Sequence, residues 1–217
     1  MTSRPPPLVS VIGAPIGHSR SPALHGYWLR RFGVRGHYVP MEVAPDKLND
    51  VIRLLPAMGF VGANITVPYK EDILEIADLV SDRATVIGAA NTLIFRSDGK
   101  IHADNTDGYG FMANLRQNAP NWDPRSGPAV VFGAGGASRA VISALLDANV
   151  PEIRLANRTR IRAEKLHDDF GNRVQVHEWV QAGNALEGAM TVVNTTSLGM
   201  IGHPDLRVPL DALSPGM

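Results

Sequence analysis

The sequence predicts a protein of two α/β domains, the first containing a mixed, mainly parallel sheet. Strand-like runs alternate with helix-like runs along the chain, which is typical of βαβ units. A break rich in proline and turn-forming residues, NAPNWDPRSGP at 118–128, interrupts this alternation. Beyond the break a new cycle begins with a strand-like run and a glycine-rich turn. We therefore expect domains at 1–117 and 128–217, joined by a linker at 118–127.

The first domain is expected to contain three strands, three helices and a hairpin. β-Branched and aromatic runs predict the strands, 3.6-residue apolar spacing predicts the helices, and Asp98-Gly99 predicts the hairpin turn. The strands are expected at 8–15, 36–43 and 60–67, the helices at 22–33, 45–59 and 70–80, and the hairpin at 91–105.

The second domain is expected to alternate more regularly. Its strands are predicted at 129–136, 152–158, 173–179 and 190–197, and its helices at 138–149 and 160–171.

Composition excludes several classes of protein. The 217 residues contain 21 basic and 21 acidic side chains, a balance that argues against binding to nucleic acid or to a membrane surface. The chain has 0 cysteines, so it has neither a thiol nucleophile nor a thiolate metal site. Its seven histidines lack paired ligand spacing, and we expect no metal. Neither a signal peptide nor a membrane span is apparent, so we expect a cytoplasmic protein.

The stretch VVFGAGGASRA predicts a dinucleotide-binding turn in the second domain. Gly133, Gly135 and Gly136 stand between a strand and a helix, where glycines allow backbone N–H groups to approach a pyrophosphate at the helix N-terminus. Ser138 replaces the usual third glycine and is small enough for close packing. This context favours dinucleotide binding by a Rossmann-type domain, the alternative being an ordinary tight turn between a strand and a helix without a ligand.

The end of the next strand selects the cofactor. NAD-binding domains place an acidic residue there, whereas this chain has Asn157, Arg158 and Thr159. A guanidinium grips a phosphate through its fork of N–H donors. The sequence therefore predicts NADP, the alternative being surface arginines at the start of a helix.

Polar side chains of the first domain follow separate strand ends, and such ends converge at one edge of a sheet. They are expected to line one pocket that suits a small polyhydroxylated acid. The set comprises Ser19, Ser21, Asn64, Thr66, Lys70, Asn91 and Asp107.

The chain resembles the shikimate dehydrogenase family, the NADP-dependent enzymes that reduce 3-dehydroshikimate. The resemblance runs in order through almost the whole sequence. Its motifs are GxPxxHSxSP at 13–22, GxNxTVPxK at 62–70, GAxNT at 88–92, DNTDG at 104–108, GAGGASRA at 133–140, NRT at 157–159 and NTTSLGM at 194–200.

The resemblance implies a role for each matched residue. Lys70 and Asp107 would be the catalytic pair. Ser19 and Ser21 would hold the substrate carboxylate, while Asn64, Thr66, Asn91 and Asp107 would bind its hydroxyls. Cofactor contacts would come from Gly133, Ala134, Gly135, Gly136, Ala137, Ser138, Asn157, Arg158, Thr159, Thr195, Ser197 and Met200.

The chemistry supports Lys70 in its own right. Hydride delivery to a ketone builds negative charge on the oxygen, so a positioned proton donor lowers the barrier. Asp107 nearby would orient the ammonium group and keep it charged. Taken alone, a lysine before Glu71 and Asp72 is usually a solvated charge.

Other interpretations stay open. Quinate is the main competing substrate, and a non-catalytic module that binds shikimate or NADP to regulate a partner is the competing class. The resemblance also implies a further strand and a C-terminal helical segment after Met217, so we expect the second domain to lack its final elements. The oligomeric state cannot be inferred from the sequence.

Overall fold

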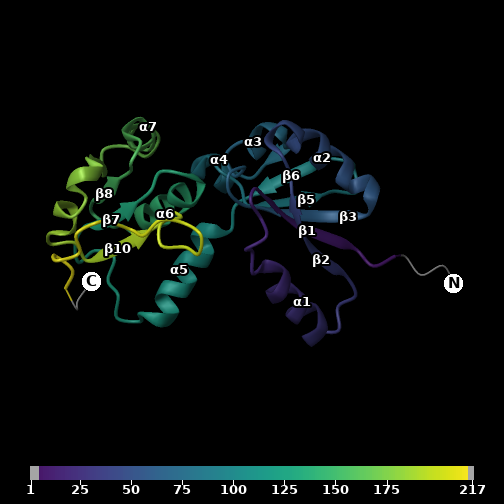
Figure 1. The fold of residues 1–217 in the computed structure, drawn as a ribbon, viewed down its shortest axis with the longest axis horizontal. Helices are drawn as coiled ribbons and strands as arrows, with labels where there is room; N and C mark the ends of the chain where they lie inside the picture. The colour runs from purple at the N-terminus through teal and green to yellow at the C-terminus, as the bar shows by residue number, and fades with distance from the viewer. Residues whose placement is uncertain (1–4, 215–217) are drawn as a thin grey trace. The chain divides into compact units, whose positions relative to one another are not determined.

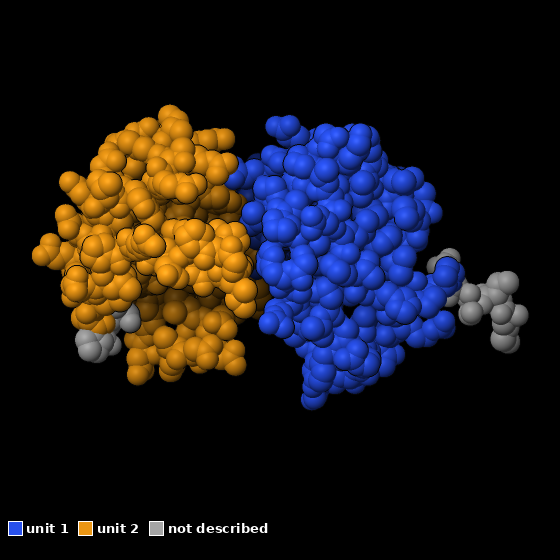
Figure 2. Space-filling view, in the orientation of Figure 1, with its two compact units in different colours: residues 1–106 blue, residues 107–217 orange. Residues whose placement is uncertain are grey.

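The computed structural model describes residues 5–214. The chain divides into two compact units, residues 1–106 and 107–217, which Figure 2 distinguishes by colour. Each unit contains one sheet and its own hydrophobic core. The linker predicted at 118–127 lies beyond this division and remains a prediction.

Within the described residues, unit 1 contains a six-stranded sheet in the order β2-β1-β3-β5-β6-β4 (Figure 1). β1 pairs in parallel with β2 and β3, and β4 with β6, whereas β5 is antiparallel to β3 and β6. This arrangement confirms the mixed, mainly parallel sheet. The strands are β1 (Leu8–Gly13), β2 (His37–Glu42), β3 (Phe60–Ile65), β4 (Leu79–Val80), β5 (Thr92–Phe95) and β6 (Ile101–Asp104).

Helices α2, α3 and α4 enclose the core of unit 1. Ile12, Ile52, Ile65 and Leu93 are almost fully buried in this core, whereas no residue of α1 is buried. The predicted helix over 45–59 ends early because Pro56 lacks the N–H that a continuing helix requires, and a 3₁₀ turn follows. The α-helices are α1 (Ser21–Arg31), α2 (Leu48–Leu54), α3 (Ile73–Ile76) and α4 (Asp82–Ile87), with 3₁₀ turns at Pro45–Lys47 and Leu55–Met58.

The helix predicted over 70–80 is wrong. Residues around Lys70 form turns, and only the four-residue α3 is helical before β4 begins. The Lys70 carbonyl accepts a hydrogen bond from Ala90 instead of from the next helical turn, and Asp78 exchanges hydrogen bonds with the backbone of Ile101. Tertiary hydrogen bonds thus override the helical periodicity.

Unit 2 is built on four parallel strands in the order β10-β7-β8-β9, counted within the described residues. The strands are β7 (Ala129–Phe132), β8 (Ile153–Ala156), β9 (Val174–His177) and β10 (Thr191–Asn194). The helices are α5 (Asp107–Asn118), α6 (Gly136–Asp147) and α7 (Arg160–Phe170), with 3₁₀ turns at Trp179–Gln181 and Asn184–Leu186.

Two apolar clusters cover the faces of this sheet. Val131 and Leu155 pack with residues of α6 and α7, whereas Val130 and Phe132 pack with the 3₁₀ turns and with Val208. This alternation of strands and helices confirms the Rossmann-like domain. Among the described helices, none combines the length and the apolar character needed to cross a bilayer.

Candidate active site

Three strands bring polar residues to one edge of the sheet in unit 1. In the antiparallel register, Asn64 of β3 lies opposite Thr92 of β5, and Thr92 lies opposite Asp104 of β6. Asn91 immediately precedes Thr92. The hairpin therefore places Asn91 and the segment that follows β6 beside the end of β3.

Asn64 is held through both ends of its side-chain amide. Its Oδ1 accepts a hydrogen bond from the Tyr38 hydroxyl at 2.7 Å, and its Nδ2 donates to the backbone carbonyl of Asn91 at 3.3 Å. Burial raises the pKa of Tyr38 to about 12, although a hydrogen bond with Ser21 acts in the opposite direction. The hydroxyl therefore stays protonated throughout the physiological range.

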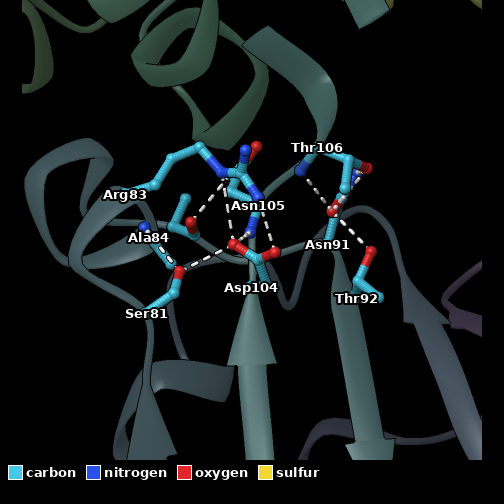
Figure 3. Close-up of polar contacts among 9 residues, drawn as sticks. Ser81, Arg83, Ala84, Asn91, Thr92, Asp104, Asn105 and Thr106 are labelled. Atoms are coloured by element: carbon cyan, nitrogen blue, oxygen red, sulfur yellow. Dashed lines mark hydrogen bonds and ion pairs between the residues drawn. The ribbon is translucent and has the colours of Figure 1, made fainter. Parts of the chain in front are cut away.

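Asn91 connects β5 to the segment after β6 (Figure 3). Its Oδ1 accepts from the backbone N–H of Thr106 at 3.0 Å and from the Thr92 hydroxyl at 2.8 Å. Its Nδ2 donates to the Thr106 hydroxyl oxygen at 3.0 Å. These bonds fix the residue that directly precedes Asp107.

Asp104 anchors the same segment from its other side (Figure 3). Its carboxylate accepts from the Ser81 hydroxyl at 2.6 Å, from Arg83 Nη2 at 2.6 Å and from the Asn105 backbone at 2.7 Å. Burial disfavours the charged form, but the hydrogen bonds from Arg83, Ser81 and Asn105 outweigh burial and hold the pKa of Asp104 below its usual value. Ser81 also caps α4 by accepting from the Ala84 N–H.

Replacing Asp104 with asparagine is expected to destabilise the protein by about 1–2 kcal/mol at neutral pH, because the charged acceptor shared by three donors is lost. A carboxylate whose pKa is lowered by folding contributes stability above its unfolded pKa and loses it as the pH falls through the folded value. The difference between the variant and the wild type should therefore shrink below about pH 3.8, the reference value for Asp104.

Urea denaturation at several pH values measures this difference. Asp98→Asn is the matched control, because Asp98 also pairs with an arginine but lies in the exposed hairpin turn. Equal stability of Asp104→Asn and the wild type at neutral pH would contradict the proposed anchor.

Ser19, Ser21 and Thr66 follow the ends of the parallel strands β1 and β3, so they leave the sheet at the same edge. Ser21 begins α1, and its backbone N–H donates to Ser19 Oγ at 3.3 Å. The Thr66 N–H donates to the Ile12 carbonyl at 2.9 Å. A Cβ on Gly13, the last residue of β1, would lie 2.6 Å from the Thr66 methyl group, so this position requires glycine.

Lys70 lies in the turns between β3 and α3. Its backbone carbonyl accepts from the Ala90 N–H at 2.7 Å, which ties it to the residue before Asn91. Asp107 begins α5 and is grouped with unit 2. The pairing of Lys70 with Asp107 therefore remains a prediction.

The glycine-rich turn of unit 2 has the geometry that close approach of a phosphate requires. Gly133 has φ +108°, which is accessible essentially to glycine, and a Cβ there would lie 2.7 Å from Thr195 Oγ1. Gly135 precedes α6, and a Cβ on it would meet no atom within 4 Å. Space is therefore open above a twelve-residue helix N-terminus, which fits a bound pyrophosphate.

Ser138 takes the position of a third glycine and links this turn to β10. It is fully buried; its Oγ accepts from the Gly135 N–H at 3.3 Å and hydrogen-bonds Thr195 Oγ1 at 2.6 Å. Thr195 in turn donates to the Phe132 carbonyl at 2.6 Å. These bonds give Ser138 and Thr195 a role in shaping the turn.

A pocket of about 500 Å³ lies beside the ends of β8 and β10. Both polar side chains and an aromatic ring line it, and the polar set suits the sugar and phosphate groups of a nucleotide. Its lining includes Asn157, Arg158, Trp179, Thr196, Ser197 and Arg207. Sequence reasoning missed Trp179 and Arg207, because neither lies in a recognised motif.

The glycine-rich turn and Thr195 lie outside this lining, and so do Thr159 and Met200, which were also predicted to contact the cofactor. Asn157 Nδ2 donates to the Thr159 carbonyl at 2.8 Å, so Thr159 closes the turn before α7. Met200 is 46% exposed on the segment after β10. No three His, Asp or Glu side chains in the described part of the chain are close enough to share a metal ion.

Comparison with known proteins covers both units. Residues 11–93 match the family described as the shikimate dehydrogenase substrate binding domain, and residues 117–201 match shikimate / quinate 5-dehydrogenase. The shikimate dehydrogenase (NADP(+)) of Cereibacter sphaeroides is 70% identical over 96% of this chain and 75% of its own length. That of Paracoccus denitrificans is 64% identical over 99% of this chain and 76% of its own length.

Solved structures show the same fold. Shikimate 5-dehydrogenase from Thermus thermophilus, in complex with NADP(H) and shikimate, is 34% identical with a TM-score of 0.81, over 94% of this chain and 73% of its own. Quinate dehydrogenase from Corynebacterium glutamicum, in complex with NAD, is 29% identical with a TM-score of 0.86, over 98% of this chain and 78% of its own. The chain therefore belongs to the shikimate dehydrogenase family of NADP-dependent oxidoreductases.

Proposed function

We propose that this protein catalyses the reversible, NADP-dependent reduction of 3-dehydroshikimate to shikimate, with Lys70 and Asp107 as its catalytic pair. The observation that carries the proposal is the polar edge of unit 1, where Asn64 and Asn91 hold fixed amides beside the turn that carries Lys70. Such amides can both donate to and accept from the hydroxyls of a small polyhydroxylated acid.

The bound cofactor supplies the hydride during reduction and accepts it during oxidation. Lys70 donates a proton to the substrate oxygen as the carbonyl becomes an alcohol, and it takes that proton back in the reverse direction. Asp107 orients the ammonium group. Ser19 and Ser21 hold the substrate carboxylate, while Asn64, Thr66 and Asn91 hold the ring hydroxyls.

The residues of unit 2 fit the two phosphate groups of NADP, the central pyrophosphate and the 2′-phosphate. Gly133 to Ala137 and Ser138 hold the pyrophosphate at the N-terminus of α6, and Asn157 to Thr159 hold the 2′-phosphate. Thr195, Ser197 and Met200 border the nicotinamide. Because the chain contains no cysteine, it suits a reducing compartment, and we place the enzyme in the cytoplasm.

Arg158→Ala should weaken NADP binding by about tenfold or more and leave NAD binding unchanged, because a charge-assisted bond to the 2′-phosphate is lost. Arg160→Ala is the matched control from the same helix start. The Arg160 guanidinium is already bound to Glu164 at 2.7 Å and to Glu178, so its removal should affect NADP binding less.

Titration of both cofactors with each variant measures the two dissociation constants. Tighter binding of NAD than of NADP by the wild type, or an equal loss of both cofactors in Arg158→Ala, would contradict the assignment of the 2′-phosphate site.

The quinate dehydrogenase among the structural relatives makes quinate the second candidate substrate. Quinate carries one more hydroxyl than shikimate. Ser19 and Ser21 favour shikimate in our interpretation, and a comparison of the two substrates at equal concentration tests that preference.

A further inference from the structure

Tyr38 connects two residues that the proposed function places on the substrate, and no motif draws attention to it. It lies on β2, the outermost strand on one side of the sheet, whereas Asn64 lies on β3, with β1 between them. The tyrosine side chain therefore spans the intervening strand to place its hydroxyl 2.7 Å from Asn64 Oδ1. A hydrogen bond with Ser21 involves the same hydroxyl.

The direction of these hydrogen bonds is determined by the backbone. The carbonyl of Asn91 can only accept, so Asn64 must turn its Nδ2 toward that carbonyl. Its Oδ1 then faces Tyr38, and the tyrosine hydroxyl must be the donor. The Asn91 carbonyl, which can only accept, therefore selects the orientation of the amide, and the Tyr38 hydroxyl holds the Oδ1 end in that orientation by donating to it.

The tyrosine ring is itself held in place. It stacks on the imidazole of His25 with ring centroids 4.1 Å apart and an angle of 4° between the planes. His25 contacts Trp28 edge-to-face at 5.2 Å. Burial lowers the pKa of His25, which favours the neutral imidazole. This stack positions the hydroxyl independently of any ligand.

We propose that Tyr38 is a positioning residue that holds the side-chain amide of Asn64 in place, in the orientation set by the Asn91 carbonyl, for recognition of a substrate hydroxyl. The second N–H of Asn64 Nδ2 and the second lone pair of Oδ1 then point in set directions. A substrate hydroxyl meets one donor and one acceptor in a known arrangement. This inference rests on the proposed function, because it takes the bound molecule to be shikimate.

Tyr38→Phe removes the hydroxyl and keeps the ring that stacks on His25. Loss of one hydrogen bond that holds the amide should raise the KM for shikimate by roughly three- to tenfold. The kcat should change by less than about twofold and the KM for NADP should stay constant, since Tyr38 acts through Asn64 and Ser21, which are assigned to substrate binding.

Tyr27→Phe is the matched control. Tyr27 lies on the exposed side of α1 and accepts a hydrogen bond from Arg31 at 2.8 Å, so its substitution should leave every constant unchanged. A double-mutant cycle with Asn64→Ala provides the decisive comparison. In the Asn64→Ala background, the change from Tyr38 to phenylalanine should raise the KM for shikimate clearly less than it does in the wild type, because only the hydrogen bond with Ser21 is then lost.

Steady-state kinetics with the wild type come first, because a wild type that does not turn over shikimate refutes the proposed function and not the role of Tyr38. With an active wild type, an unchanged KM in Tyr38→Phe would overturn the inference. So would an equal increase in both backgrounds, or a joint loss of kcat and NADP affinity, which indicates a merely structural role.

Discussion

Replacing Lys70 with alanine is expected to lower kcat by about 10²- to 10⁴-fold, the usual contribution of a positioned proton donor. Negative charge that develops on the substrate oxygen during hydride transfer would then have no proton source at that position. The KM for shikimate should change only a few-fold, because the serine and asparagine side chains to which we assign substrate binding remain.

The matched control for this prediction is Lys100→Ala. Lys100 is exposed and follows the turn between β5 and β6, at the opposite end of the hairpin from Asn91 and Asp104. Its substitution should leave kcat unchanged. Near-normal turnover in Lys70→Ala, measured beside this control, would reject Lys70 as the proton donor.

Gly133→Ala is expected to lower the free energy of unfolding by about 2–4 kcal/mol, because a side chain would be forced into a glycine-only conformation against Thr195 and Thr196. The Cβ would lie 2.7 Å from Thr195 Oγ1 and 3.1 Å from Thr196 Cγ2. NADP affinity should fall with it, since the turn before α6 is displaced.

Gly135→Ala separates folding from binding in the same turn. Gly135 has φ −121°, which any residue adopts, and open space around its Cβ position. This variant should unfold at the same urea concentration as the wild type yet bind NADP more weakly, because the methyl group occupies space left for the pyrophosphate. Equal free energies of unfolding for Gly133→Ala and Gly135→Ala would contradict the expected destabilisation by a side chain at position 133.

Much of the architecture could be predicted because its signals are local. The β-branched runs predicted β7, β8 and β10, and Asp98-Gly99 predicted the hairpin of β5 and β6. Glycines between β7 and α6 predicted the tight turn that the structure shows there. These features depend on neighbouring residues, so a single sequence carries them.

The error after Lys70 arose because distant residues decide the structure there. Periodicity predicted a helix over 70–80. However, Tyr69 is buried and its hydroxyl donates to the Val43 carbonyl, while the Ala90 N–H donates to the Lys70 carbonyl. The short helix α4 was missed, although Ser81 as a cap and Gly88 at its end were local signals for it.

The sequence named some residues of the candidate site and missed others. Motifs named Asn64 and Asn91, and the strand register explains why they meet. Tyr38 escaped notice because a tyrosine in an alternating strand resembles an ordinary packing residue. Its partner is 26 residues away, and only the fold shows that they touch.

The most direct test of the account is the formation of NADPH when the purified protein is mixed with shikimate and NADP⁺. We expect NADPH and 3-dehydroshikimate to appear in equal amounts, faster than with quinate at the same concentration, and not with Lys70→Ala above the rate without enzyme. Binding of shikimate and NADP⁺ without NADPH formation would contradict the account and identify a binding module instead. A rate with quinate equal to that with shikimate would contradict the assigned substrate.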